Sequence, residues 1–154
     1  MMKRLMTSYI LKALVAFQGF SAIPFGFLLI VDPSGENLGF TMNMLKGSPF
    51  TSFLIPGLFL FLMLGLFPLF VFYGLITKKN FGLLEKFNCY KNYHWSWTFS
   101  HFFGLLLVLW INMQLVFGIG FHIFHFVYSI LGLLIVFLVH LPLVKENYRI
   151  YQKT

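Results

Sequence analysis

The chain has 154 residues, of which 59% are hydrophobic and 10% charged, and its net charge is +7. This composition, with a mean hydropathy of +0.85, excludes an ordinary soluble domain, which needs more polar surface to cover its core. The single cysteine, Cys89, excludes an intramolecular disulfide and the paired thiols of a four-helix thiol oxidase.

Four long apolar segments predict an all-α integral membrane four-helix bundle that forms one domain over residues 1–154. The predicted spans cover about 9–31, 50–76, 97–118 and 121–144. Residues 98–144 contain no Asp, Glu, Lys or Arg, and a straight helix of that length would reach about 70 Å, roughly twice a hydrocarbon core. Gly118-Ile119-Gly120 therefore predicts a turn. The basic N-terminus imitates a signal peptide, but its apolar run to Val31 predicts an uncleaved first span.

The cations predict the orientation of the bundle. Ten of the eleven Lys and Arg residues flank the first span, fall between spans two and three, or follow span four, and only Lys46 lies in another loop. The positive-inside rule then places both termini in the cytoplasm and the chain in the cytoplasmic membrane as a multi-pass protein. This placement indicates anionic lipid head groups, and no nucleic acid, as partners of the basic side chains.

Span one carries Gln18 and Ser21, one helical turn apart on a shared face. We interpret Gln18 as a polar contact between helices, together with three polar residues of the later spans: Asn112, Gln114 and Ser129. Such contacts contribute about 0.5–2 kcal/mol each. Asp32-Pro33-Ser34-Gly35 then predicts a turn.

Each of the two long loops predicts a short interfacial helix. In the loop 32–49, Leu38, Met42 and Leu45 form a helical stripe that we expect to face acyl chains. Ser48-Pro49 resembles a helix cap followed by proline, which predicts that span two begins near Pro49. The loop 77–96 is basic, and its Tyr and Trp residues (Tyr90, Tyr93, Trp95 and Trp97) predict an interfacial aromatic belt.

Span two has small and kinking residues on otherwise Phe- and Leu-rich faces. Gly57, Gly65 and Pro68 predict a close helix–helix contact, because small residues let backbones approach one another. The remaining faces are expected to meet lipid.

The histidines of spans three and four allow two hypotheses. Antiparallel packing would bring His101 and His140 to a similar depth near the cytoplasmic face, where paired imidazoles could hold a haem. At the outer end, His122 and His125 have the i, i+3 spacing of two metal ligands, with Asp32 or Glu36 as a third. The ordinary alternatives are histidines that bond backbone, lipid or water, and a pair that responds to pH.

One face of span four is predicted to be polar along its whole length. His122, Ser129 and His140 lie within about 20° of one another on a helical wheel. Because polar groups are costly in hydrocarbon, this face is expected to point into the bundle.

The segment from Gly26 to Pro68 contains G-F-L-L-I-V-D-P-S-G, L-G-F, S-P-F-T-S-F-L-I-P-G-L-F-L-F and G-L-F-P. With Trp110-Ile-Asn-Met-Gln114 and the run from Gly132, the chain resembles small, functionally uncharacterised bacterial four-helix membrane proteins, and its plan is similar to that of DoxX-like proteins. The resemblance implies a bacterial cytoplasmic membrane and four spans, but no activity. The Asp32–Gly57 segment either fixes the connection between spans one and two or forms a small binding pocket.

The expected function is a non-enzymatic membrane component that binds lipid or a partner protein, without a cofactor. No nucleophile elbow and no HExxH motif occur in the sequence, although this does not decide whether the chain is an enzyme. Four such helices bury little surface alone, which favours a homo-oligomer or a partner membrane protein. The alternatives are a redox protein with haem or a transition metal, and a channel or carrier. No carboxylate lies within a span, which disfavours coupled transport.

Overall fold

The computed structural model describes residues 2–150, with side chains from Met6 onward. This part of the chain is helical and contains no β-strand. Its elements, in order, are α1 (Met2–Val31), two 3₁₀ turns η1 (Glu36–Leu38) and η2 (Met42–Leu45), α2 (Leu54–Phe61), the π-helical turn η3 (Leu62–Leu66), α3 (Phe67–Thr77), α4 (Gly82–Phe87), α5 (Trp95–Val116), α6 (Ile123–His140) and α7 (Pro142–Tyr148). Lys153 and the side chains of Lys3 and Arg4 lie outside the described residues.

Four helices of the described chain are long and apolar enough to cross a membrane: Met6–Val31, Leu54–Thr77, Trp95–Val116 and Ile123–His140. The second comprises α2, η3 and α3 without interruption. The all-α class is therefore confirmed, with four helices that could span a membrane, and the boundaries of all four differ by a few residues from the predicted ones.

The second span starts later than the sequence indicates. The hydroxyl of Ser48 donates to the Leu45 carbonyl at 2.9 Å instead of capping a helix, and α2 begins at Leu54. The residues between them fold down onto the bundle, where the Phe53 amide donates to the Pro33 carbonyl at 2.9 Å. Burial of the Phe53 ring against Leu29 outweighs the local cap signal.

The fourth span ends earlier, at His140. Pro142 disfavours helical geometry at the residue before it, and Leu141 is extended with ψ 134°. The chain then turns into α7, which the sequence analysis treated as part of a span and a polar tail. Tyr148 of α7 is 2% exposed, and its hydroxyl donates to the Leu75 carbonyl at 3.0 Å. Burial raises the pKa of that hydroxyl.

The two connecting loops behave differently. Leu45 is buried, and Leu38 packs against the same small cluster, so the loop 32–49 folds inward as two 3₁₀ turns and the expected interfacial helix is wrong. The loop 77–96 does contain a short helix, α4, on which Leu83 and Phe87 are exposed.

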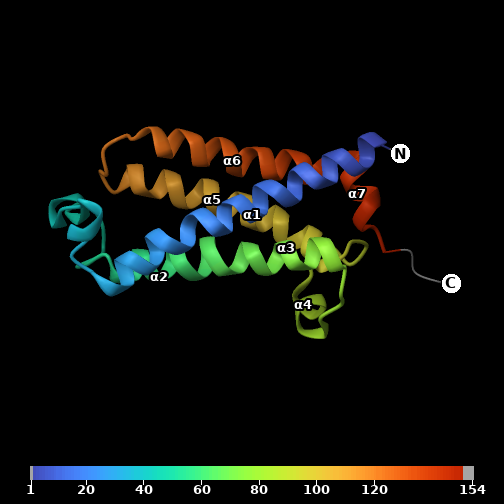
Figure 1. Ribbon diagram of the computed structural model, residues 1–154, viewed down its shortest axis with the longest axis horizontal. Coiled ribbons are helices and arrows are strands. Elements are labelled where there is room, and N and C mark those ends of the chain that lie inside the picture. Colours follow the sequence, from blue (N-terminus) through green and yellow to red (C-terminus); the bar gives the residue numbers. More distant parts are fainter. Residues whose placement is uncertain (1, 151–154) are drawn as a thin grey trace.

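The long helices run up and down, and both ends of the described chain lie at one end of the bundle together with α4 (Figure 1). We call this the proximal end, and the opposite end, with η1, η2 and the turn at 117–122, the distal end. Helix α1 crosses the bundle obliquely, from α6 and α7 at the proximal end to α2 at the distal end (Figure 1).

Glycines allow close helix contacts at two places in the bundle. A methyl group on Gly57 would lie 2.6 Å from Leu29, and one on Gly65 would lie 2.9 Å from Ile23, so both glycines of span two face α1. Pro68 is buried on the same span. Between α5 and α6, a methyl group on Gly132 would lie 2.9 Å from the Gly104 carbonyl oxygen. This contact between α5 and α6 was not among those predicted from the sequence.

The aromatic residues of the proximal loop do not all form an interfacial belt. Trp95 and Trp97 are completely or almost completely buried, and their indole N–H groups donate to the carbonyls of Lys79 and Val139, each at 2.9 Å. Trp95 therefore holds the loop to the bundle, and Trp97 joins α5 to α6. Beside them, burial lowers the pKa of His94, although Glu85 partly opposes this effect.

Candidate binding cavity at the distal end

A cavity of about 600 Å³ lies inside the distal half of the bundle. Its walls come from α1, α2, η3, α5 and α6, and its roof comes from the loop after α1 and the turn between α5 and α6. This volume is within the range of small-molecule sites, which are mostly apolar with a few placed polar groups. Most lining residues are apolar, and none of them is Asp, Glu, Lys or Arg.

The cavity follows from the way the helices diverge. At the proximal end, α3 packs against α5, whereas α2 at the distal end lies closely against α1 and has no comparable contact with α5 among the described residues. Phe59 of α2 reaches across and stacks on Trp110 of α5, with ring centroids 4.2 Å apart. These two large rings hold α2 and α5 apart, whereas glycines let other helices of the bundle pack closely.

The roof is attached to both sides. Gly47 touches the Phe117 carbonyl, and the Phe50 and Phe117 rings meet edge to face at 6.0 Å. The base of this loop is fixed by Asp32. The Ser34 hydroxyl donates to one carboxylate oxygen at 2.5 Å, and the Asn37 amide donates to the other at 2.9 Å. These hydrogen bonds lower the pKa of the Asp32 carboxyl, and the bond from the Ser34 hydroxyl has the larger effect.

Gln18 brings a polar group into the wall near the middle of α1. The residue is 1% exposed, and its amide nitrogen donates to the Leu64 carbonyl over a long 3.5 Å. That carbonyl accepts no helical bond from Pro68, four residues later, because proline has no N–H. The Gln18 Oε1 atom is buried and has no hydrogen-bonding partner within the described part of the chain.

Trp110 and His125 bring two further polar atoms to the cavity. The Trp110 indole nitrogen is a donor, and it is buried without a partner among the residues described. His125 is 7% exposed, and its Nδ1 lies 3.0 Å from the His122 amide nitrogen. Because an amide N–H can only donate, Nδ1 accepts and the neutral ring carries its proton on Nε2. That Nε2 is also buried and unpaired over the described range.

These three atoms are the buried side-chain polar atoms without a partner in the described residues, and all three residues line the same cavity. An unsatisfied buried polar group costs about 1–3 kcal/mol, so such groups are normally paired. All three therefore belong to side chains at the wall of one chamber.

The other predicted polar contacts lie in different places. Gln114 also lines the cavity. Asn112 is exposed, and its amide donates to the Val108 carbonyl of its own helix at 2.8 Å, so it does not join helices as expected. Ser129 is half-buried on α6 and does not line the cavity.

The polar face of α6 does not point into the bundle as a whole. His122 and His140 are exposed, whereas the buried face is formed by His125, Gly132, Ile135 and Val139. The predicted face lies next to the buried one on the helix. The sequence does not distinguish them, because the apolar residues of α6 that face lipid are as hydrophobic as those that face protein. His122 and His125 both line the cavity, but no group of three or more His, Cys, Asp and Glu residues suited to a metal ion occurs in the described chain.

His101 and His140 do come together near the proximal end. Their rings are hydrogen-bonded, with His140 Nε2 3.1 Å from His101 Nδ1, and they meet edge to face. The haem hypothesis stays a prediction from the sequence.

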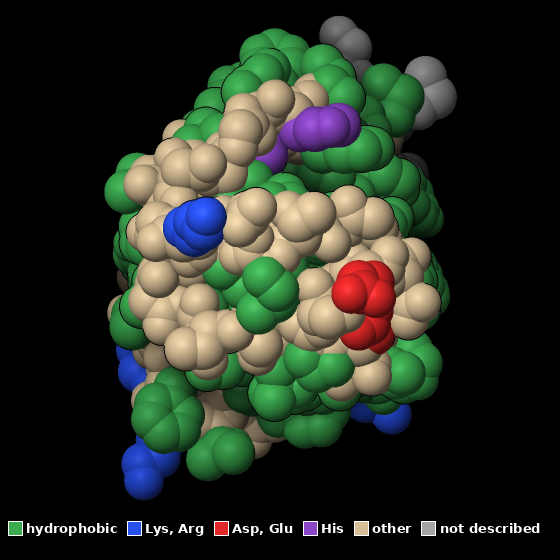
Figure 2. All heavy atoms as spheres, turned by 90° about the vertical axis from the view of Figure 1, so that its left-hand side faces the viewer, with side chains coloured by type: hydrophobic (Ala, Val, Ile, Leu, Met, Phe, Trp, Pro, Cys, Tyr) green, Lys and Arg blue, Asp and Glu red, His purple; other side chains and the backbone are tan. Residues whose placement is uncertain are grey.

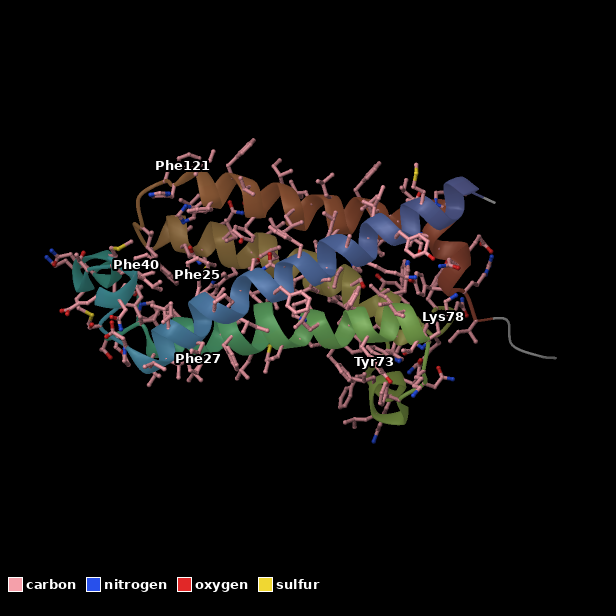
Figure 3. All side chains as sticks on the ribbon, in the orientation of Figure 1. Phe25, Phe27, Phe40, Tyr73, Lys78 and Phe121 are labelled. Carbon is pink, nitrogen blue, oxygen red and sulfur yellow. The ribbon has the colours of Figure 1, made fainter. Side chains whose placement is uncertain are left out.

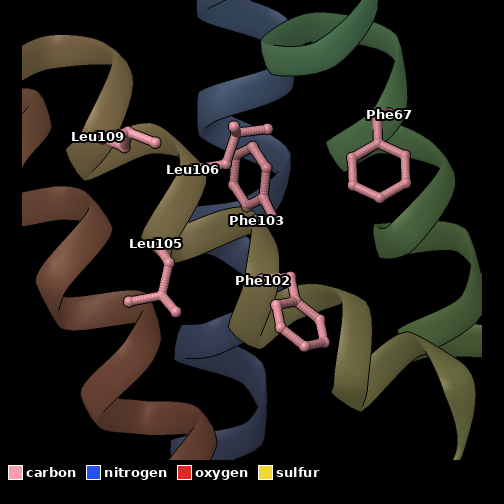
Figure 4. A pocket seen from close by; sticks show the side chains of 6 residues that line it. All are labelled: Phe67, Phe102, Phe103, Leu105, Leu106 and Leu109. Atoms are coloured by element: carbon pink, nitrogen blue, oxygen red, sulfur yellow. The ribbon is translucent and has the colours of Figure 1, made fainter. Parts of the chain in front are cut away.

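A second pocket, of about 430 Å³, lies between α3 and α5 (Figure 4). The side chains that line it are all Phe or Leu: Phe67, Phe102, Phe103, Leu105, Leu106 and Leu109. It offers no side-chain hydrogen bond to orient a ligand, and its residues Phe102, Leu105 and Leu109 are exposed. This surface suits a lipid chain without specificity.

The distal cavity reaches the surface at aromatic side chains. Phe25 and Phe124 line it and are 50% and 61% exposed, and Phe25 lies toward α5 near the distal end (Figure 3). Figure 2 looks onto the distal end face, where acidic and basic side chains are few and histidine lies beside hydrophobic groups.

Comparison with protein-family models, with curated proteins and with solved structures gives no match to this chain.

Proposed function

We propose that this chain is a four-span protein of the cytoplasmic membrane that binds an elongated apolar molecule in its distal cavity, without catalysing a reaction. The observation that carries this proposal is the joint presence of apolar walls and three unpaired buried polar atoms in one chamber. A molecule drawn from the surrounding lipid would fill the walls and pair the polar atoms.

The orientation is part of the proposal. Basic side chains gather at the proximal end, on α4 and its flanks and on α7. Of the Lys and Arg side chains that the structure describes, Lys46 lies in the distal loop. The positive-inside rule then assigns the proximal end, with both termini, to the cytoplasm. In this orientation the cavity opens in the outer leaflet, and the proximal cations face anionic head groups.

Quenching of Trp110 by the methyl ester of dibromostearic acid tests the binding function. The full chain is placed in nanodiscs, and tryptophan fluorescence is followed as the probe is added. We expect quenching that saturates, and we expect Trp110→Phe to remove the saturable part, because Trp95 and Trp97 are buried at the other end.

A pair of matched variants controls for quenching from bulk lipid. Ala22 is buried and lines the cavity, so Ala22→Phe should fill the chamber and weaken binding at least fivefold. Ala13 is exposed on the same helix, and Ala13→Phe should leave binding unchanged. Quenching that rises in proportion to the probe in the lipid, and equally in both variants, would overturn the proposal.

A further inference from the structure

The polar atoms at the distal end of the cavity restrict the chemistry of its ligand. Trp110 and His125 lie on neighbouring antiparallel helices, α5 and α6. A helix rises about 1.5 Å per residue, so Trp110 lies about 9 Å from the distal end of α5 and His125 about 3 Å from the start of α6. Both are therefore in the distal third of the bundle.

Both groups are donors. The indole N–H has no lone pair to offer, and the His125 Nε2 carries the ring proton because its Nδ1 accepts from the His122 amide at 3.0 Å. A ligand group that forms a hydrogen bond with either donor must be an acceptor, such as an oxygen with two lone pairs.

That acceptor is expected to be neutral. The cavity lining has no Lys or Arg, and a carboxylate or phosphate taken out of water without a cation is strongly disfavoured. A carbonyl of an ester has the required lone pairs and no charge. The remaining walls are mostly apolar, although Gln18 and Gln114 also line them, and they extend toward the bundle centre, past Leu107 and Leu64.

We infer that the ligand is a neutral acyl ester, whose carbonyl group lies at the distal end of the cavity beside the donors Trp110 and His125 and whose chain runs toward the bilayer centre. This inference rests on the proposed function of the same cavity. It excludes phospholipid head groups and ionised fatty acids as the bound polar group.

Three probes of equal chain length separate the possibilities: tritiated methyl stearate, octadecane and stearate. Saturable binding to protein nanodiscs, in excess over empty nanodiscs, is measured at pH 8, where stearate in solution is ionised. We expect methyl stearate to bind about tenfold more tightly than octadecane, and stearate to bind no better than octadecane.

Two substitutions test the donors. Trp110→Phe keeps the ring that stacks on Phe59 and removes the N–H. His125→Asn keeps an oxygen acceptor for the His122 amide and removes the group at Nε2, while His125→Gln restores an N–H donor. We expect Trp110→Phe and His125→Asn each to lower the preference for ester over alkane three- to tenfold, with the alkane affinity unchanged, and His125→Gln to recover part of it.

The outcomes distinguish the inference from the function on which it rests. Saturable binding of all three probes with equal affinity, or a preference for stearate, overturns the ester inference and leaves the binding function standing. Absence of saturable binding for every probe overturns both, and would indicate that water occupies the chamber.

Discussion

Gln18 shows what a single polar side chain does inside an apolar bundle. Its amide nitrogen makes one long hydrogen bond, to the Leu64 carbonyl, which cannot accept from Pro68, and its oxygen is buried without a partner among the described residues. The gain from a weak bond and the cost of a buried acceptor are of similar size, about 1 kcal/mol each. The two effects therefore nearly cancel, and the Gln18 side chain contributes little net free energy to helix association.

Replacing Gln18 by methionine tests this assignment. Gln18→Met removes the unpaired acceptor and keeps most of the volume, so we expect the free energy of unfolding in detergent to stay equal or to rise by about 1 kcal/mol. Thermal or denaturant unfolding measures this change.

Gln18→Ala is the control, because it leaves a void in the wall and should destabilise the protein. If Gln18→Met destabilised the protein by as much as Gln18→Ala, the contact to Leu64 would be the main role of this residue, as the sequence analysis proposed.

At the scale of helices, the bundle consists of two pairs joined by small residues. Gly57 and Gly65 let α1 approach span two, and Gly104 and Gly132 let α5 approach α6. In a membrane there is no hydrophobic drive between helices, so close packing at small residues supplies much of the association. The pairs diverge where bulky Phe59 and Trp110 stand between them, and this divergence creates the cavity.

A methyl group on Gly132 should disturb the α5–α6 pair. Its Cβ would lie 2.9 Å from the backbone oxygen of Gly104 and 2.7 Å from Val108, and a backbone oxygen cannot move aside alone. We expect Gly132→Ala to cost about 1–3 kcal/mol of unfolding free energy.

The matched control is Gly82→Ala at the start of α4, where nothing lies within 4 Å of the added methyl group. This change should be neutral or slightly stabilising. Equal stability of both variants would show that the two helices are not in close contact at Gly132.

For the whole molecule, the distribution of charge and polar groups gives the two ends different roles. The proximal end combines basic side chains with internal hydrogen bonds. The Tyr148 hydroxyl donates to the Leu75 carbonyl, and the Asn147 amide donates to the Ser8 hydroxyl, each at 3.0 Å. The distal end has few charges and holds the cavity. Under the proposed function, the proximal end stays closed at a charged surface and the distal end admits an apolar molecule.

Cysteine labelling in intact cells tests the orientation. Cys89 is exposed beside α4 at the proximal end, so a membrane-impermeant maleimide should label it only after permeabilisation. In a Cys89→Ser background, Ser34→Cys places a thiol in the distal loop, and it should react without permeabilisation. The opposite pattern would reverse the proposed orientation.

The sequence by itself determined the helical class, the four long apolar helices and the close contact at the glycines of the second one, because each follows from long apolar runs and small residues along one stretch of chain. It could not fix which stripe of α6 faces inward, since Phe, Leu and Val face lipid and protein alike. It also missed α7, whose Tyr148 has a role only when α1 and α3 lie beside it.

The cavity was decided by the tertiary structure alone. Gln18, Gln114 and the histidine pair were visible in the sequence, whereas Trp110 drew attention only through a resemblance, although an indole N–H in hydrocarbon always needs an acceptor. Their convergence depends on how far α2 stands from α5, and that distance is set by side chains on two helices that are remote in sequence. Local patterns cannot encode a space between elements, because it exists only once they have packed.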